Sequence, residues 1–269
     1  MLLQTDFHNN FDYFSSLEWL IIDECDRLFE PTFRSQLSLI FNVCNQSKAK
    51  LNHALFSATY DMNLENWCKL HLDNLVTVLV GGKNTVTETV EQKLLFTGSE
   101  TGKLFALKSH ISSGCQTPLI IFVNKIKKAS FLQRELLSMG IMVECIHADR
   151  SQEQRDKIVR AFREGTIPFL ICTELMGRGI DFKAVNQGMI VSLSESDLKC
   201  TYPSVINYDC PSSKFAYIHH IGRTGRAGRK GSAITYYTQK DEENLCAILN
   251  ILRQSGAEIP DHLKNFNKK

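Results

Sequence analysis

Three carboxylates near the start of the chain have the type and spacing that a metal-dependent hydrolysis site requires. Asp23, Glu24 and Asp26 follow the apolar run at residues 19–22, which has the length and composition of a buried strand. In open parallel sheets, ligands bind beyond the carboxyl ends of the strands. A carboxylate at this place can hold Mg²⁺ through its waters, while its neighbour orients an attacking water. Alternatively, the three carboxylates only complement the positive end of a following helix.

Two hydroxyl residues, Ser57 and Thr59, follow the next apolar run of the sequence. In one interpretation they cap the helix predicted over residues 61–72. In the other, the Ser-Ala-Thr segment is a hinge that senses the acidic run and transmits its state to a second lobe.

A third polar group follows the strand predicted at residues 167–173. A hydroxyl at Thr173 and exposed backbone amides at Gly179 suit a phosphate of a nucleic-acid backbone. Asp181 can accept hydrogen bonds from a ribose. The alternative for this segment is a glycine-rich turn.

An arginine cluster lies in the last third of the chain. Arg223, Arg226 and Arg229 recur every three residues, each preceded by a glycine. A solvated face has no need of these glycines, which let a backbone pass close to another group. Guanidinium groups held in this way can stabilise charge on a transferring phosphoryl group. The carboxylates and the arginines together therefore predict the two halves of a nucleotide-hydrolysis site. The glycines are Gly222, Gly225 and Gly228.

Two lysine-containing segments imitate a phosphate loop. In residues 98–104 only three residues separate Gly98 from Gly102, where a phosphate loop requires one more, and Leu104 stands where it requires Ser or Thr. Residues 81–85 lack the leading glycine. Both segments are predicted to be turns. A kinase built around the first is a rival hypothesis, and against it we expect Lys103→Ala to leave function unchanged.

Short apolar runs alternate with helical patterns along the chain, which predicts an α/β fold with a parallel sheet covered on both faces. Residues 187–204 interrupt this alternation with a long segment that contains its own strand-like run. Strands are predicted at residues 19–22, 53–59, 76–80, 90–96, 118–123, 142–147, 167–173, 205–209 and 232–237. Helices are predicted at residues 33–44, 61–72, 101–111, 127–140, 151–165 and 241–256.

The composition is that of a globular protein able to bury a core. The 269 residues are 43% hydrophobic, and a net charge of +2 is too small to argue for nucleic acid by itself. Nine cysteines without a closely spaced pair indicate free thiols in a reducing compartment. Without a signal peptide or an apolar stretch of about 20 residues, we expect an intracellular soluble protein.

The ordered motifs resemble those of the DEAD-box RNA helicases, and the resemblance covers nearly the whole chain. The subfamily that it resembles most serves small-subunit ribosomal RNA processing in the nucleolus. The motifs are DECD, SAT, IIFVNK, QEQR, TELMGRGID and HHIGRTGR, in this order, and the subfamily stretches are DRLFE, TVEQKLLFTGSETGK and RGIDFK.

The resemblance implies RecA-like parallel sheets in two lobes, of which the first is partial. Residues 1–80 would be the C-terminal part of the helicase ATP-binding domain, and residues 81–89 a linker. Residues 90–255 would be the complete helicase C-terminal domain, and residues 256–269 a basic tail. The ligands it implies are ATP, Mg²⁺ and RNA.

The resemblance also implies a role for each matching residue. Asp23 would hold Mg²⁺ through water, Glu24 would activate the attacking water, and His219 would bridge to the acidic motif when the lobes close. Coupling of hydrolysis to unwinding would involve Asp26, Ser57 and Thr59. The ribose of ATP would contact Asp181, and its γ-phosphate Arg223 and Arg226. The RNA backbone would contact Arg155, Thr173 and Gly179.

The sequence departs from the family pattern in several places. The family's glutamine motif, phosphate loop and first RNA-binding motifs would lie upstream of Met1. His220 stands in place of an arginine, Lys125 in place of a hydroxyl residue, and Cys25 in place of alanine. About 17 residues of the segment 187–204 are extra by this comparison, and altered splicing or gene modelling would explain them.

These observations favour an ATP-dependent RNA helicase of ribosome biogenesis, active as a monomer in the nucleus and nucleolus. Its expected partners are pre-ribosomal RNA and ribosome-assembly proteins, with no membrane. The alternative is a catalytically inactive RNA- or partner-binding fragment, because no phosphate loop is present.

Overall fold

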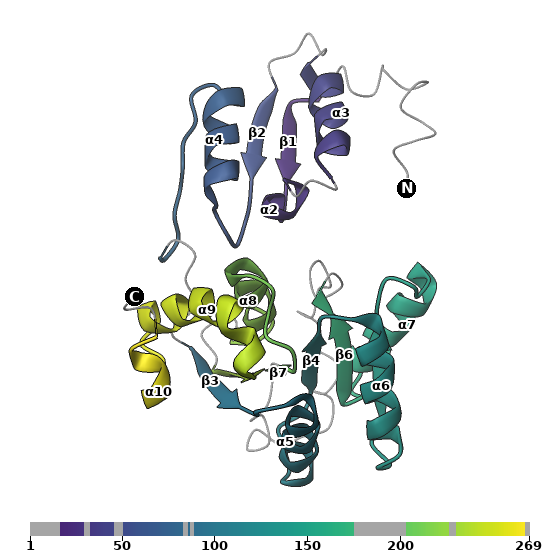
Figure 1. Cartoon of the computed structure of the whole chain (residues 1–269). Coiled ribbons are helices and arrows are strands. Elements are labelled where there is room, and N and C mark those ends of the chain that lie inside the picture. Colours follow the sequence, from purple (N-terminus) through teal and green to yellow (C-terminus); the bar gives the residue numbers. More distant parts are fainter. Residues whose placement is uncertain are drawn as a thin grey trace, which may run out of the picture. The chain divides into compact units, whose positions relative to one another are not determined.

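The computed structural model divides the chain into two compact units, residues 1–84 and 85–269 (Figure 1). The boundary falls inside the segment 81–89 that the sequence predicts to be a linker. The residues that the structure describes are 17–29, 33–45, 51–82, 86, 89–174, 203–225 and 230–266.

The first unit is a two-stranded parallel sheet with helices packed on one face. Its strands pair in register, with Trp19 opposite Asn52. Ile22 of the first strand is buried against Leu37 and Leu64 of the helices. The described elements are β1 (Trp19–Ile22), α2 (Cys25–Leu28), α3 (Arg34–Asn45), β2 (Asn52–Leu55) and α4 (Met62–His71).

The other face of this small sheet is exposed in the described part of the unit. Along β1 the burial alternates, and the side chains of Trp19 and Ile21 are 56% and 65% exposed. Parallel sheets in folded domains normally have both faces covered. The described residues of the unit therefore leave apolar sheet surface without cover.

The strand predicted at residues 76–80 does not form. Val76 and Val80 are 81% and 96% exposed, and the segment has no regular secondary structure. Its β-branched composition favours a strand, but a strand needs a neighbour for its backbone hydrogen bonds. No such neighbour exists among the described residues of the first unit.

The second unit is a six-stranded sheet in which every pairing is parallel. Its strand order is β3-β8-β7-β4-β6-β5, so the strand order departs from the chain order through helical crossovers (Figure 1). The predicted α/β fold is confirmed. The elements are β3 (Val90–Phe96), α5 (Glu100–Ser112), β4 (Leu119–Val123), α6 (Ile126–Leu137), β5 (Val143–Ile146), α7 (Gln152–Arg163), β6 (Phe169–Thr173), β7 (Ser204–Asn207), α8 (Lys214–Ile221), β8 (Gly231–Tyr237), the 3₁₀ turn η3 (Gln239–Asp241), α9 (Glu242–Gln254) and α10 (Asp261–Lys264).

Both faces of the larger sheet are covered, as its sequence predicts. The central strand β4 is apolar throughout, and alternate side chains enter two separate cores. Ile120 and Phe122 face the core that contains residues of α7, α8 and α9. Ile121 and Val123 face the core that contains residues of α5 and α6. A run without polar alternation is typical of a strand buried on both faces.

Local sequence signals place the crossover helices. Ser151 caps α7 in a capping box with Gln154, and Gly165 follows the helix with a φ of 74°. Ile158 and Phe162 lie on its buried face. Gly140 and Gly256, with φ of 76° and 68°, similarly follow α6 and α9. No helix in the described part of the chain is long and apolar enough to cross a membrane.

The segment predicted as a basic tail, residues 256–269, packs against the second unit as far as the structure describes it. Leu263 in α10 is 4% exposed and joins the core, together with Ile259 and Phe266. The guanidinium of Arg253 on α9 donates to the Phe266 carbonyl at 3.1 Å.

Candidate nucleotide and RNA site

The acidic run begins one residue beyond β1, at the carboxyl end of that strand. Asp23 is exposed, and its Oδ1 accepts a hydrogen bond of 2.8 Å from the Glu24 amide. Glu24 has a φ of 48°, in the left-handed region that non-glycine residues rarely occupy. Such backbone outliers occur most often at functional sites. The turn therefore presents Asp23 to the solvent at the end of a parallel sheet.

Backbone hydrogen bonds fix this turn to the second strand. The Phe56 amide donates to the Ile22 carbonyl at 2.8 Å, and the Cys25 amide donates to the Phe56 carbonyl at 3.0 Å. Cys25 is 1% exposed, and burial raises the pKa of its thiol to about 12. A protonated small side chain at this position packs as the apolar residue that it replaces in the family pattern.

The Ser-Ala-Thr segment contacts the acidic run directly. The Thr59 hydroxyl donates a short hydrogen bond to Oδ2 of Asp26, although 33 residues separate the two. The Ser57 hydroxyl donates to the Thr59 carbonyl at 2.6 Å. The N-terminal cap of α4 is instead Asp61, whose carboxylate accepts a hydrogen bond from the Leu64 amide at 2.7 Å. The capping interpretation is therefore wrong for Thr59, and the contact with the acidic run is present.

The carboxylates of the first unit suit a Mg²⁺ ion that is bound mainly through water and phosphate, and not a metal site made of protein ligands alone. Among the residues that the structure describes, no group of three or more His, Cys, Asp or Glu could hold a metal. Mg²⁺ is usually bound by one or two carboxylates, several waters and the phosphates of a substrate. Asp23 offers hard oxygen donors at an exposed position, whereas Asp26 is engaged by Thr59. Asp23 is thus the residue that fits the ion.

In the second unit, predicted site residues gather at the carboxyl end of the central strands. Thr173 ends β6 and is 5% exposed. Burial raises the pKa of the Cys172 thiol in the preceding position of β6, and the positive charge of Arg223 partly opposes that shift. The Arg223 Nε donates to the His219 carbonyl at 3.3 Å, and His219 and Arg223 are 4% and 6% exposed. The structure thus brings Thr173, His219 and Arg223 into one region.

The helix that carries His219 was not predicted from the sequence. Ser213 caps α8 by accepting from the Ala216 amide at 3.1 Å, and the helix is buried from Ala216 to Ile221. A serine followed by an apolar run was the available signal. His220, the departure from the family pattern, is 1% exposed and stacks on Phe122 with ring centroids 3.8 Å apart.

The conformation of Gly225 confirms that a glycine is needed at this position of the arginine cluster. The group that its backbone approaches is Val90 of the second unit. Gly225 has a φ of 63°, and a Cβ would collide with the Val90 side chain. The Thr89 hydroxyl donates to its carbonyl at 2.9 Å. The glycine therefore lets the backbone at residue 225 pack against the start of β3.

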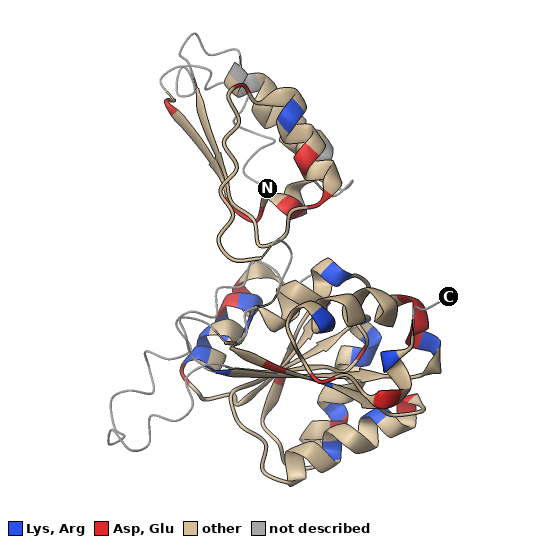
Figure 2. Ribbon diagram, turned by 90° about the vertical axis from the view of Figure 1, so that its left-hand side faces the viewer, with Lys and Arg blue, Asp and Glu red and all other residues tan. Residues whose placement is uncertain are grey.

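Arg155 lies on α7, where its Nε donates to the Arg150 carbonyl at 3.1 Å. Figure 2 shows the positions of basic and acidic residues interspersed along the ribbon of the second unit. Contact with a polyanion would therefore depend on particular residues, in keeping with the small net charge.

Several predicted residues lie outside the described part of the chain. They are Gly179 and Asp181, the arginines Arg226 and Arg229 with Gly228 between them, and residues 187–202 of the inserted segment.

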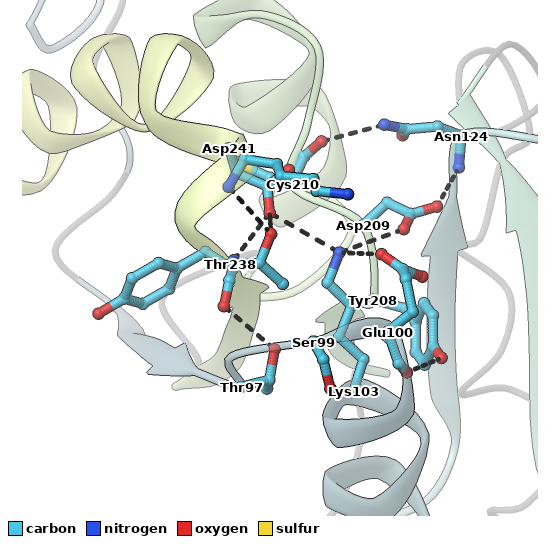
Figure 3. Close-up of polar contacts among 12 residues, drawn as sticks. Thr97, Ser99, Glu100, Lys103, Asn124, Tyr208, Asp209, Cys210, Thr238 and Asp241 are labelled. Atoms are coloured by element: carbon cyan, nitrogen blue, oxygen red, sulfur yellow. Dashed lines mark hydrogen bonds and ion pairs between the residues drawn. The ribbon is translucent and has the colours of Figure 1, made fainter.

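The false phosphate loop is a turn followed by a helix cap. Gly98 has a φ of 69°, and the Ser99 hydroxyl accepts from the Gly102 amide at 3.1 Å to cap α5. Lys103, however, is 2% exposed and lies 3.0 Å from Glu100 and 3.5 Å from Asp209 (Figure 3). This burial argues against the expectation that Lys103→Ala leaves function unchanged, because the change would remove a cation from the buried carboxylate of Asp209.

Comparison with known proteins finds a helicase family model that matches part of each unit. The DEAD/DEAH box helicase family model matches residues 1–67, and the helicase conserved C-terminal domain model matches residues 102–203. The chain is made of DEAD-box helicase domains. The ordered motifs had predicted this family, and the prediction is confirmed.

Similar DEAD-box proteins include curated relatives from animals and fungi. A probable ATP-dependent RNA helicase DDX52 from Bos taurus is 48% identical over 94% of this chain and 40% of its own length. The ATP-dependent RNA helicase ROK1 from Saccharomyces cerevisiae is 40% identical over 94% of this chain and 42% of its own length. The chain thus spans about two fifths of the length of these relatives.

Solved DEAD-box structures share the fold. Dbp5 L327V of S. cerevisiae, bound to RNA and ADP BeF3, has a TM-score of 0.74 and 26% identity, covering 93% of this chain and 61% of that protein. Prp28 of Chaetomium thermophilum, bound to ADP, has a TM-score of 0.54 and 26% identity, covering 92% of this chain and 55% of that protein. The RecA-like fold expected from the sequence is confirmed.

Proposed function

We propose that this chain forms part of an ATP-dependent RNA helicase that couples RNA-stimulated ATP hydrolysis to the separation of short duplexes. The observation that carries the proposal is the family match of both units, joined to the exposed Asp23 and the acidic turn at the end of β1. The names of its relatives, ATP-dependent RNA helicases, support it. An inactive RNA- or partner-binding fragment is the less favoured alternative.

In this proposal the first unit supplies the hydrolytic groups. Asp23 would hold Mg²⁺ through water, and a bound ion would supply positive charge toward the phosphates of ATP. Glu24 orients the attacking water from the neighbouring position. Asp26, Ser57 and Thr59 couple hydrolysis to strand separation, which the hydrogen bond from Thr59 to Asp26 supports.

The second unit supplies cationic groups and RNA contacts. Arg223 and Arg226 stabilise the charge that develops on the transferring phosphoryl group, Asp181 contacts the ribose, and His219 bridges to the acidic motif when the lobes close. RNA is held through its sugar–phosphate backbone, a mode of contact that carries no base code. The proposed backbone contacts are Arg155, Thr173 and Gly179.

We further propose that the helicase acts as a monomer in ribosome biogenesis, on pre-ribosomal RNA in the nucleus and nucleolus, beside ribosome-assembly proteins. The resemblance of residues 26–30, 89–103 and 178–183 to the subfamily of small-subunit RNA processing supports this role. The domain limits are residues 1–80, 81–89 and 90–255. The boundary at residue 84 lies within the proposed linker.

The test is RNA-stimulated ATP hydrolysis by a longer protein, in which the remainder of the first lobe, with its phosphate loop, is restored upstream of this chain. Glu24→Gln should abolish turnover while RNA binding, followed by fluorescence anisotropy, stays within about twofold. Glu18→Gln is the matched control, because it makes the same change at the opposite, exposed end of β1. Normal turnover by the Glu24 variant would refute the assignment.

A further inference from the structure

An ion cluster around a buried lysine lies outside the groups assigned above, at the carboxyl ends of the strands in the second unit. At its centre is Lys103 on α5, which is 2% exposed. Its ammonium lies 3.0 Å from Glu100, 3.5 Å from Asp209 and 3.8 Å from Asp241. Figure 3 shows this side chain extending from the first turn of α5 into the space between the two aspartates. A lysine is rarely this buried unless it is paired.

Asp209 joins the cluster to the end of β4. It is 5% exposed; its Oδ2 accepts from the Asn124 amide at 2.9 Å, and its Oδ1 accepts from Lys128 at 2.6 Å. The side-chain amide of Asn124 donates to the Cys210 carbonyl at 3.1 Å (Figure 3). An ion pair and hydrogen bonds therefore connect the backbone that follows β7 to the end of β4 and the start of α6.

The segment that follows β7 leads directly into α8. Only residues 210–212 separate Asp209 from Ser213, the residue that caps the helix. The Ser212 hydroxyl in this link donates to Glu174 beyond β6 at 2.5 Å. The helix then carries His219, and Arg223 lies two residues beyond its last residue, Ile221. The ion cluster therefore holds the segment that precedes α8, and the position of Arg223 depends on where this helix begins.

Asp241 extends the same cluster to the helix that packs beside α8. Its Oδ2 accepts from both the amide and the hydroxyl of Thr238 at 2.8 Å, in the capping box that precedes α9. Residues of α8 and α9 share one core. Lys103 therefore links the starts of two adjacent helices from a third element, α5.

Net stability alone is a weak reason for such a cluster. A buried ion pair often contributes little relative to apolar side chains of the same volume, whereas the loss of one partner leaves an uncompensated charge. What it does supply is a defined geometry. We propose that Lys103 is a positioning residue, which acts through Asp209 and Asp241 to fix the start of α8 and so the direction of Arg223. The role of Arg223 toward phosphate rests on the proposed function.

The first test measures geometry without activity. Hydrogen exchange of the 269-residue chain, followed by mass spectrometry, should show that Lys103→Met accelerates exchange in the peptide spanning residues 208–222 by at least about tenfold. Peptides from the centres of β4 and β6 should keep their rates. Equal acceleration in every peptide, or none at α8, would overturn the proposal.

The matched control is Lys108→Met. Lys108 lies on the same helix and forms one ion pair of 2.7 Å with Glu135, but both side chains are about one third exposed. The control should leave exchange at α8 unchanged. If Lys103→Met does not fold, Lys128→Met removes the shortest contact of Asp209 from a partly exposed position and should still accelerate exchange at α8. Unchanged exchange in that variant would also overturn the proposal.

The second test asks whether the position of Arg223 affects ATP hydrolysis by the longer protein. Lys103→Met should lower kcat for ATP hydrolysis at least about tenfold with the KM for RNA unchanged, and Lys103→Arg should restore part of it. A variant that keeps the wild-type kcat would show that Lys103 does not position the arginine. If the wild type hydrolyses no ATP but α8 still responds in the exchange experiment, the proposed function fails and the positioning role stands.

Discussion

At the scale of single residues, the contact between Thr59 and Asp26 joins two motifs that are distant in the sequence. Thr59 is 2% exposed, so its hydroxyl donates to a carboxylate in a place where water competes little. The contact directly connects the Ser-Ala-Thr segment with the acidic run. This hydrogen bond is a physical connection, within the first unit, for the proposed coupling of ATP hydrolysis to strand separation.

Thr59→Val should separate this contact from the rest of the unit. The change keeps the shape of the side chain and removes the donor, so it should lower the free energy of unfolding by about 1–3 kcal/mol. In the longer protein it should reduce duplex separation far more than ATP hydrolysis. Denaturant unfolding and parallel assays of the two activities measure these effects.

Thr77→Val is the control, since Thr77 is exposed. It should change neither stability nor activity. If Thr59→Val left duplex separation and ATP hydrolysis in their wild-type ratio, the coupling role of Thr59 would be wrong.

At the scale of elements, a polar network holds α8 against the sheet. His220 on α8 contacts the Asn207 side chain at 2.8 Å, and the Asn207 amide donates to Thr235 on β8 at 2.9 Å. Asn207 is fully buried. Because the network spans α8, β7 and β8, its central amide connects the arginine-bearing segment to two strands.

Asn207→Leu should therefore destabilise the second unit. The change preserves approximate volume but removes the amide that His220 and Thr235 contact, at a cost of about 1–3 kcal/mol for each polar group it affects. The measurement is thermal unfolding followed by circular dichroism. Asn250→Leu, at an exposed position of α9, should leave the midpoint unchanged, and an equally small effect of Asn207→Leu would contradict the network's role.

The sequence was most informative where local pattern and burial agree. β4 and β6 are continuous apolar runs, and α7 carries its own cap, so the pattern alone located them. Residues 76–80 have an equally strong strand composition, but whether a strand forms there depends on a neighbour, which composition does not reveal. The helix α8 was missed because its residues were interpreted only as part of an arginine motif.

The candidate site also has residues that the local pattern predicts and residues whose role depends on distant contacts. The positions of Asp23 and Thr173 at strand ends followed from the alternation of strands and helices. The burial of Lys103 did not, because its partners Asp209 and Asp241 lie more than 100 residues away in the sequence. Spacing correctly excluded a phosphate loop there, but only the fold shows that the lysine closes a charge cluster.

At the scale of the whole molecule, the two units have separate cores. The core of the first unit lies between a two-stranded sheet and its helices, and Trp19 and Ile21 remain exposed on the other face. The second unit has a six-stranded sheet with a core on each face. We infer that the second unit accounts for most of the stability of the chain.

Residues 85–269 alone should therefore fold cooperatively. The fragment should unfold with a midpoint within a few degrees of the main transition of the 269-residue chain, because none of its core residues comes from the first unit. Differential scanning calorimetry of the two proteins makes the comparison. A fragment without a cooperative transition would show that the second unit depends on the first.

The most direct test of the proposed helicase activity is ATP-dependent separation of a short RNA duplex by the longer protein. We predict that the wild type releases a labelled strand only when ATP and Mg²⁺ are present. Arg226→Ala should bind RNA normally but hydrolyse ATP about 10³-fold more slowly, and so fail to release the strand. Strand release without ATP, or at the wild-type rate by the Arg226 variant, would contradict the account.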